Sequence, residues 1–333
     1  MSDAVTMLRE GRTARLLLDR PKALNALDLP MIRALDAALA AWRDEPRVQV
    51  VVIDSSSERA FCAGGDIRAI RAAALAGDFA AVEQFFAEEY ALNAAIAAYP
   101  KPYVALIDGI CMGGGIGVSV HGTVRVATEH GIFAMPETAI GFFPDIGATY
   151  VLPRLPGALG IYLGLTGERL RGADAVHAGL ATHFVPRAAL PSLRAALAAD
   201  GVAAVATHAA PLPPFTIAPH RAAIDRCFSA PSVPEILARL AAEGTEWAGA
   251  TLATMRMMSP SSLSWSLAAI LRGATLDLPA ALAAELRLTR PVCRHPDFAE
   301  GVRAMVVDKD RQPRWTPATL ESVDPAAIAA MLD

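Results

Sequence analysis

Short apolar runs and helically spaced apolar positions alternate along the first part of the chain. Five runs rich in leucine and β-branched residues predict buried strands, at 14–18, 49–53, 103–107, 123–127 and 131–135. Between the first two runs, apolar residues recur at helical spacing behind Asp28, a candidate N-cap, at Met31, Ile32, Leu35, Leu39 and Trp42. Strands of this kind with interposed helices predict an α/β fold.

The pattern then changes along the chain. Residues 67–98 form an alanine-rich insertion with a mostly helical pattern, and the proline-rich stretch 207–220 indicates an irregular connection. Nearly all of the pattern beyond it is helical. We therefore predict a core at 1–205, which contains the insertion, and a mainly helical C-terminal region at 206–333.

Composition narrows the class of protein. The chain has 333 residues, of which 53% are hydrophobic and 19% are charged, and its formal net charge is −4. These values are typical of a globular protein and give no electrostatic reason to expect a nucleic acid or an anionic membrane as partner. The most apolar stretch, 103–120, contains Asp108 and five glycines, so we interpret it as strand, turn and helix.

Cysteine and histidine usage indicates neither a disulfide framework nor a metal site. The four cysteines are far apart, without a CxxC pair, and the seven histidines form no HxxxH pair. The N-terminus carries no apolar segment of signal-peptide type. Together with the alanine- and arginine-rich composition, these features lead us to expect a cytoplasmic bacterial protein.

Two glycine clusters, 63–66 (AGGD) and 112–115 (MGGG), each follow a predicted strand and open a helix. Backbone N–H groups at a helix N-terminus have no intrahelical partner, and two of them directed at one oxygen would stabilise an oxyanion. Tight packing or a simple turn also explains such glycines. A dinucleotide-binding fingerprint fits worse, because Val118 stands where GxGxxG requires glycine.

Three carboxylates occupy apolar surroundings. Glu137 and Asp145 are eight residues apart across a segment rich in Gly, Pro and Phe, and Glu89 falls in the apolar stripe of the helix predicted at 79–98. Buried carboxylates have raised pKa values and serve as acids, bases or nucleophiles. The structural alternatives are a helix N-terminal charge for Glu137, a cap for Asp145 and a salt bridge for Glu89.

Ser119 is a weaker candidate for a nucleophile. GxSxG is not met, because His121 takes the place of the last glycine, and the serine lies inside a predicted helix.

Three segments together resemble the enoyl-CoA hydratase/isomerase (crotonase) superfamily: 18–27 (LDRPKALNAL), 60–67 (AFCAGGDI) and 109–115 (GICMGGG). The resemblance implies a crotonase (ClpP-like) spiral of ββα repeats, followed here by a C-terminal helical region. It also implies an acyl-CoA substrate, no further cofactor, and an oxyanion hole formed by the N–H groups of Gly65 and Gly114. The implied contacts to CoA lie at Lys22, Ala23, Leu24, Ala63, Asp66 and Ile67.

Further segments resemble the hydrolase branch of that family, above all 134–145 (AMPETAIGFFPD). Members of this branch cleave the thioester of 3-hydroxyisobutyryl-CoA, as in valine catabolism. The implied substrate contacts are Glu89, Gly114, Glu137 and Asp145. One departure from the hydratases supports hydrolysis: they carry a second catalytic glutamate three residues after the oxyanion glycine, and this chain has Gly117 there.

The resemblance implies that Glu137 either attacks the carbonyl or activates a water, with Asp145 positioning the substrate hydroxyl or sharing a proton. Two alternatives stay open, an enoyl-CoA hydratase or isomerase and a non-catalytic acyl-CoA-binding homologue. The acyl preference also stays open, because one methyl group changes binding by only about 1–3 kcal/mol. Relatives form trimers or hexamers through C-terminal helices, so a homo-oligomer is one expectation, although the longer helical tail could instead cover the chain's own active site.

Overall fold

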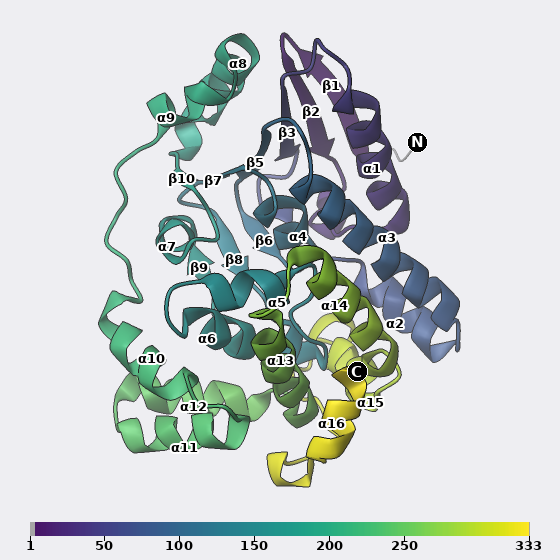
Figure 1. Cartoon of the computed structure of the whole chain (residues 1–333), viewed down its shortest axis with the longest axis vertical. Helices are drawn as coiled ribbons and strands as arrows, with labels where there is room; N and C mark the ends of the chain where they lie inside the picture. The colour runs from purple at the N-terminus through teal and green to yellow at the C-terminus, as the bar shows by residue number, and fades with distance from the viewer. Residues whose placement is uncertain (1–3, 333) are drawn as a thin grey trace. The chain divides into compact units, whose positions relative to one another are not determined.

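A computed structural model describes residues 4–332 and divides the chain into two compact units (Figure 1). The first unit comprises the segment up to Asp66, Glu88–Ala134 and Arg169–Thr216. The second comprises Ile67–Ala87, Met135–Glu168 and the segment from Ile217 onward. One boundary falls within the predicted connection at 207–220. The units are otherwise interleaved, and the linear division at residue 205 did not anticipate this.

The first unit contains two sheets. The six-stranded sheet has the order β1 (Val5–Glu10), β2 (Thr13–Leu18), β3 (Val50–Ser55), β5 (Tyr103–Ile107), β7 (Val124–Ala127) and β10 (His183–Phe184). The four-stranded sheet has the order β4 (Ala60–Cys62), β6 (Ile110–Met112), β8 (Ile132–Ala134) and β9 (Leu170–Arg171). All pairings are parallel except those of β1 with β2 and of β8 with β9.

Each repeat of the chain contributes one strand to each sheet. The strands β3, β5 and β7 lie in the larger sheet, and β4, β6 and β8, which follow them directly, lie in the smaller one. The α/β spiral of ββα repeats is thereby confirmed. The five predicted strands correspond to β2, β3, β5, β7 and β8. The pattern missed β1, which alternates with exposed residues, and the other short strands of two or three residues.

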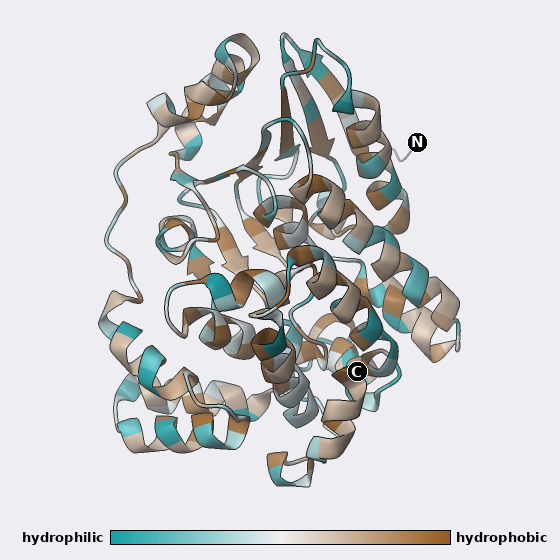
Figure 2. Cartoon of the chain, viewed as in Figure 1, coloured by the Kyte–Doolittle hydropathy of each residue, from teal (hydrophilic) through white to brown (hydrophobic). Residues whose placement is uncertain are grey.

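One helix of the first unit begins at a side-chain capping signal in the sequence. Asp28 accepts a hydrogen bond from the Met31 N–H and begins α1 (Leu29–Arg43), as predicted. Figure 2 shows the strands largely in hydrophobic colours, whereas α1 carries hydrophobic and hydrophilic residues on different faces. The other helices are the C-terminal half of α3 (Phe79–Ala97), α4 (Gly114–Val120), α7 (Gly172–Ala178), α8 (Leu190–Asp200) and α9 (Ala204–His208).

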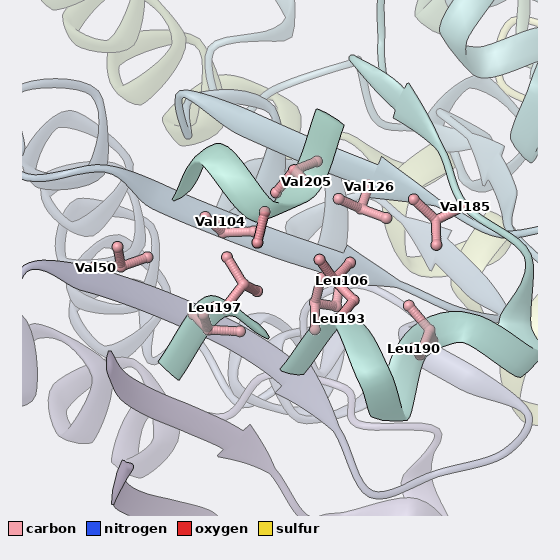
Figure 3. Packing of buried hydrophobic residues seen from close by; sticks show 11 residues of the cluster. Val50, Val104, Leu106, Val126, Val185, Leu190, Leu193, Leu197 and Val205 are labelled. Atoms are coloured by element: carbon pink, nitrogen blue, oxygen red, sulfur yellow. The ribbon is translucent and has the colours of Figure 1, made fainter. Parts of the chain in front are cut away.

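Helices α8 and α9 cover one face of the larger sheet. Leu193, Leu197 and Val205 pack against Val104 and Leu106 of β5 (Figure 3). Within the described part of the chain, Arg187–His208 is the one helical stretch long and apolar enough to cross a membrane by length and composition. Its apolar side chains instead contribute to the core. The absence of a membrane partner stays a prediction.

The second unit is helical, as the pattern beyond residue 220 predicted. Its helices are α2 (Ile67–Leu75), the N-terminal half of α3, α5 (Ala148–Val151), α6 (Leu159–Thr166), α10 (Arg221–Phe228), α11 (Val233–Glu243), α12 (Glu246–Met257), α13 (Pro260–Gly273), α14 (Leu278–Val292), α15 (Pro296–Val302) and α16 (Pro325–Leu332). Short polar side chains cap four of them, at Ser232, Thr245, Ser259 and Asp277. The polar break at 259–262 is therefore a helix start.

We expect Leu193→Ala to lower the free energy of unfolding by about 2–5 kcal/mol, because it leaves a cavity between α8 and the sheet. Leu193 is fully buried, whereas Leu212, in the irregular connection, is 40% exposed. Leu212→Ala is the matched control and should change stability by less than about 0.5 kcal/mol. Urea unfolding of both variants measures the difference, and equal effects would contradict the packing of α8 on the sheet.

Candidate active site

The two glycine clusters lie side by side in the first unit. Strands β4 and β6 pair in parallel, so the loops that follow them leave the same edge of the smaller sheet. A Cβ atom placed on Gly114 would lie 3.2 Å from the backbone nitrogen of Gly65. The structure therefore brings together the two glycines that the resemblance singled out.

The local backbone pattern does not use the N–H groups of the two glycines. The Leu27 N–H donates to the Gly64 carbonyl and the Asp66 N–H donates to the Leu27 carbonyl, each at 2.8 Å. Gly65 lies between these two bonds in a parallel bridge, so its own N–H points to the opposite side. Gly114 is the first residue of α4, where the N–H has no helical acceptor. Two such donors fit an oxyanion hole.

Glu89 lies beside these donors. It belongs to α3, it is buried as predicted, and its Oε1 would lie 2.5 Å from a Cβ on Gly114. Its neighbour Glu88 is more exposed and pairs with Arg33 at 2.7 Å. Burial, with a smaller contribution from the nearby Glu89, raises the pKa of the Cys62 thiol to about 12, so Cys62 is not a reactive thiol.

Several residues predicted to contact CoA also meet in the first unit. Lys22 and Ala23 form a short 3-10 helix, and Leu24 follows in the left-handed conformation with φ +52°. The Ala63 N–H donates to the Leu24 carbonyl at 3.0 Å, which joins the first motif to the second. Asp66 forms a salt bridge with Arg20 at 2.9 Å. Ile67 begins α2, in the second unit.

Ser119 has a structural role. It is buried inside α4, and its hydroxyl hydrogen-bonds to the Gly115 carbonyl, one turn earlier, at 2.8 Å. This geometry agrees with the sequence argument against a Ser119 nucleophile.

The other two predicted acids lie in the second unit. Glu137 begins a 3-10 helix, Glu137–Ile140, and both it and Asp145 are buried. Phe142, between them, stacks on Phe143 and Phe86 with ring centroids 4.6 and 5.3 Å apart. The apolar surroundings predicted for this segment are therefore present.

The C-terminal helices hold this segment in place. The Phe142 carbonyl accepts hydrogen bonds from Trp265 Nε1 of α13, at 3.0 Å, and from Ser262 Oγ. Gly141 has φ +67° and packs directly on the backbone of α15 at Asp297, where a Cβ would have no space. Thr138 Oγ1 donates to the Leu165 carbonyl of α6 at 3.1 Å. Three helices thus fix the backbone around Glu137.

Glu285 is a third buried acid of the second unit, and the sequence reasoning missed it. Its carboxyl oxygens accept hydrogen bonds from the Gly147 N–H (2.7 Å), the Thr149 N–H (3.0 Å) and the Thr149 hydroxyl (2.5 Å). Burial raises the pKa of Glu285 to about 8, the nearby Asp145 also raises it, and the hydrogen bonds oppose the rise. The signal was the one that identified Glu89, a charge within an apolar helical stripe, here formed by Ala281, Leu282, Leu288 and Val292.

Among residues 4–332, no group of three or more His, Cys, Asp or Glu side chains is arranged to hold a metal ion.

The raised pKa of Glu285 predicts a pH-dependent stability difference between the wild type and Glu285→Gln. In the folded chain Glu285 stays protonated up to about pH 8, whereas its ordinary pKa is 4.5. The stability that this proton supplies is complete below pH 4.5 and is lost as the pH rises towards 8. Urea unfolding at several pH values should show the wild type losing about 3–5 kcal/mol relative to the variant over this range. A change of opposite sign would contradict the raised pKa.

We expect Gly114→Ala to lower turnover on an acyl-CoA thioester by about a hundredfold, because the added methyl group displaces Glu89 and the neighbouring donors. The control is Gly249→Ala in α12, where an added Cβ meets nothing within 4 Å. That variant should keep full turnover. Steady-state rates of both variants, compared at equal folded fraction, test this prediction. Full turnover by Gly114→Ala would contradict the placement of the oxyanion donors at this site.

Curated relatives match almost the whole chain. The Xenopus tropicalis protein named "3-hydroxyisobutyryl-CoA hydrolase, mitochondrial" is 47% identical over 329 residues, which is 95% of this chain and 85% of the relative. The Homo sapiens protein of the same name is 44% identical over 334 residues, covering 97% and 86%. The expectation of a cytoplasmic bacterial location is wrong by this comparison, because these eukaryotic relatives are mitochondrial.

Two solved structures share the fold over nearly their full length. A carnitinyl-CoA dehydratase from Mycobacterium thermoresistibile has a TM-score of 0.96 at 42% identity, covering 100% of this chain and 97% of the other. An enoyl-CoA hydratase from Rhodobacter sphaeroides has a TM-score of 0.93 at 41% identity, covering 99% and 97%. The family model for enoyl-CoA hydratase/isomerase matches residues 13–332. With its ββα spiral and paired glycine loops, the chain belongs to the enoyl-CoA hydratase/isomerase family.

Proposed function

We propose that this chain hydrolyses the thioester of 3-hydroxyisobutyryl-CoA to the free acid and CoA. The observation that carries the proposal is the pair of backbone N–H groups at Gly65 and Gly114, which suits the oxyanion of thioester cleavage. The curated relatives named for this hydrolysis support the choice of reaction, since they match about 95% of the chain at 44–47% identity.

The oxyanion pair would act on the carbonyl of the thioester. As water or a carboxylate adds to the carbonyl carbon, negative charge develops on the carbonyl oxygen, which accepts hydrogen bonds from Gly65 and Gly114. The C–S bond then breaks, the sulfur leaves as the CoA thiolate, and it takes up a proton. Losing one such donor typically lowers turnover about a hundredfold to a thousandfold.

Glu137 is the proposed acid–base or nucleophilic group. In one route its carboxylate attacks the carbonyl carbon and forms a mixed anhydride, which water then opens. In the other route it removes a proton from the attacking water. Asp145 would hold the β-hydroxyl of the acyl group or share a proton with Glu137, and Glu89 would orient the acyl end. Both acids of the pair are buried, which suits proton transfer.

The segments 18–27 and 60–67 are proposed to bind the CoA moiety. The contacts assigned to CoA are Lys22, Ala23, Leu24, Ala63, Asp66 and Ile67. Lys22 is exposed and cationic, which suits a phosphate group. We propose that the reaction requires no resident cofactor or metal, because the oxyanion donors already perform the polarisation that a Lewis acid would supply.

Hydration of an enoyl-CoA is the competing function, and the names of the two solved relatives favour it. The two-glutamate route of water addition requires a second acid on α4, three residues after the oxyanion glycine. Position 117 of this chain is glycine, in the buried first half of that helix. A glycine cannot transfer a proton, so position 117 cannot supply the second acid, and the acid at Asp145, where hydratases commonly have glycine, leads us to favour hydrolysis.

Incubation with 3-hydroxyisobutyryl-CoA, following free thiol, tests the proposal. We expect thiol release by the wild type, and a loss of about 10²–10⁴-fold in kcat for Glu137→Gln and for Asp145→Asn. Asp36→Asn, on the exposed face of α1, is the control and should retain full activity.

The same preparation is offered crotonyl-CoA, following enoyl absorbance. Hydration of crotonyl-CoA without any thiol release from 3-hydroxyisobutyryl-CoA would overturn the hydrolase proposal. Tight binding of acyl-CoA with no turnover of either compound would identify a non-catalytic homologue.

A further inference from the structure

We infer that Glu285 is a positioning residue for Asp145, acting through the turn that directly follows Asp145. This inference rests on the proposed function, in which Asp145 serves the reaction. Glu285 lies 140 residues further along the chain, on α14, and both residues belong to the second unit.

The hydrogen bonds of Glu285 all go to the start of this turn and of α5. One carboxyl oxygen accepts the Gly147 N–H, and the other accepts both the N–H and the hydroxyl of Thr149. The Ala148 N–H donates to the Asp145 carbonyl at 2.8 Å and closes the turn. The carboxyl group therefore fixes three donors within four residues of Asp145.

The backbone of this turn requires such support. Ile146 has φ +56°, a left-handed conformation that is a true outlier for a β-branched residue, and Gly147 follows with φ +80°. Residues in this region keep their conformation only where the surrounding structure imposes it, and they concentrate at functional sites. Here the imposing contact is the carboxyl group of Glu285. Without it, Ile146 would relax towards φ < 0 and redirect the neighbouring Asp145.

If the start of α5 had only a structural role, the hydroxyl group of a neighbouring Ser or Thr would be enough to cap its N–H groups. At α11 to α15 of this unit the caps are Ser, Thr, Asp and His side chains adjacent to the helix they begin. At α5 the cap is instead a fully buried glutamate from a distant helix, beside a second acid. Burying an ionisable group that is costly to desolvate is the pattern expected near a reacting group.

The electrostatic surroundings couple Glu285 to Asp145. Burial is the main cause that raises the pKa of Glu285 and of the Cys293 thiol at the end of α14, and the negative charge of Asp145 raises both as well. Arg272 of α13 lines the same small cavity as Glu285 and Thr149. The turn before α5 thus contributes Asp145 to this region, the end of α14 contributes Cys293, and α13 contributes Arg272. When Glu285 ionises, a second negative charge arises beside Asp145.

The experiment compares Glu285→Gln with the wild type in the thiol-release assay across pH 6 to 9. Glutamine has one acceptor oxygen, so it cannot satisfy the donors on both sides of the turn. We expect kcat to fall about tenfold to a hundredfold with KM changed less than about twofold. We also expect the wild type to lose activity as the pH passes about 8, and the variant to lack this limb of the profile.

Two further comparisons separate positioning from general stability. Thr149→Val removes a donor to Glu285 and should lower kcat, whereas Thr149→Ser keeps the hydroxyl and should restore it. Leu282→Ala, one turn earlier on the buried face of α14, removes packing and leaves the three hydrogen-bonding partners of the turn in place. It should lower stability while leaving kcat and the pH profile unchanged.

A readout independent of activity completes the test. Amide hydrogen exchange over residues 145–152 should accelerate in Glu285→Gln and not in Leu282→Ala. Wild-type kcat and pH profile in Glu285→Gln, or unchanged exchange in this peptide, would overturn the positioning role. Failure of the wild type to release thiol would overturn the proposed function instead, and the exchange measurement would still decide on Glu285.

Discussion

The close approach of two backbone loops, 63–66 and 112–115, is the constraint on which the rest of the first unit depends. A side chain on Gly114 would collide with Glu89, and one on Gly115 would collide with the Cys62 carbonyl, so glycine is required at both positions. The approach follows from the topology. Successive repeats add neighbouring parallel strands to the smaller sheet, so the loops after β4 and β6 leave the same edge.

The second unit solves a different problem, which is to keep carboxyl groups buried and oriented. Burying an acid is unfavourable unless hydrogen bonds or neighbouring charges compensate. Around Glu137, helices α6, α13 and α15 fix the backbone at Thr138, Gly141 and Phe142 and so orient the acid. After Asp145, Glu285 of α14 fixes the backbone of the turn. The long C-terminal helical region therefore has a specific role beyond burying apolar surface.

Local sequence signals predicted the strands and the helix start that depend on residues close together in the sequence. The five apolar runs became strands and Asp28 capped α1, because burial and capping depend on residues close in sequence. The glycine loops and the burial of Glu89 were also predictable. The partition of the chain was not, because three separate segments build each unit. Nor was the partner of the turn at Ile146, since nothing local indicates that Glu285 would reach it. The positional rule that identified Glu89 applies equally to Glu285 and would have identified it.

The choice between hydrolysis and hydration depends on where the acids stand. Gly117 removes the acid that the two-glutamate route requires on α4, yet Glu89 brings a carboxylate to the first residue of that helix from α3. The absence of an acid at position 117 therefore does not by itself remove acid–base chemistry from this end of α4. What sets this chain apart from the hydratase pattern is the acid at Asp145, where that pattern commonly has glycine. The turn that follows Asp145 contains the strained Ile146 and is held by the buried Glu285. Because a strained backbone and a buried acid support this one position, Asp145 is a stronger indicator of hydrolysis than Gly117 is.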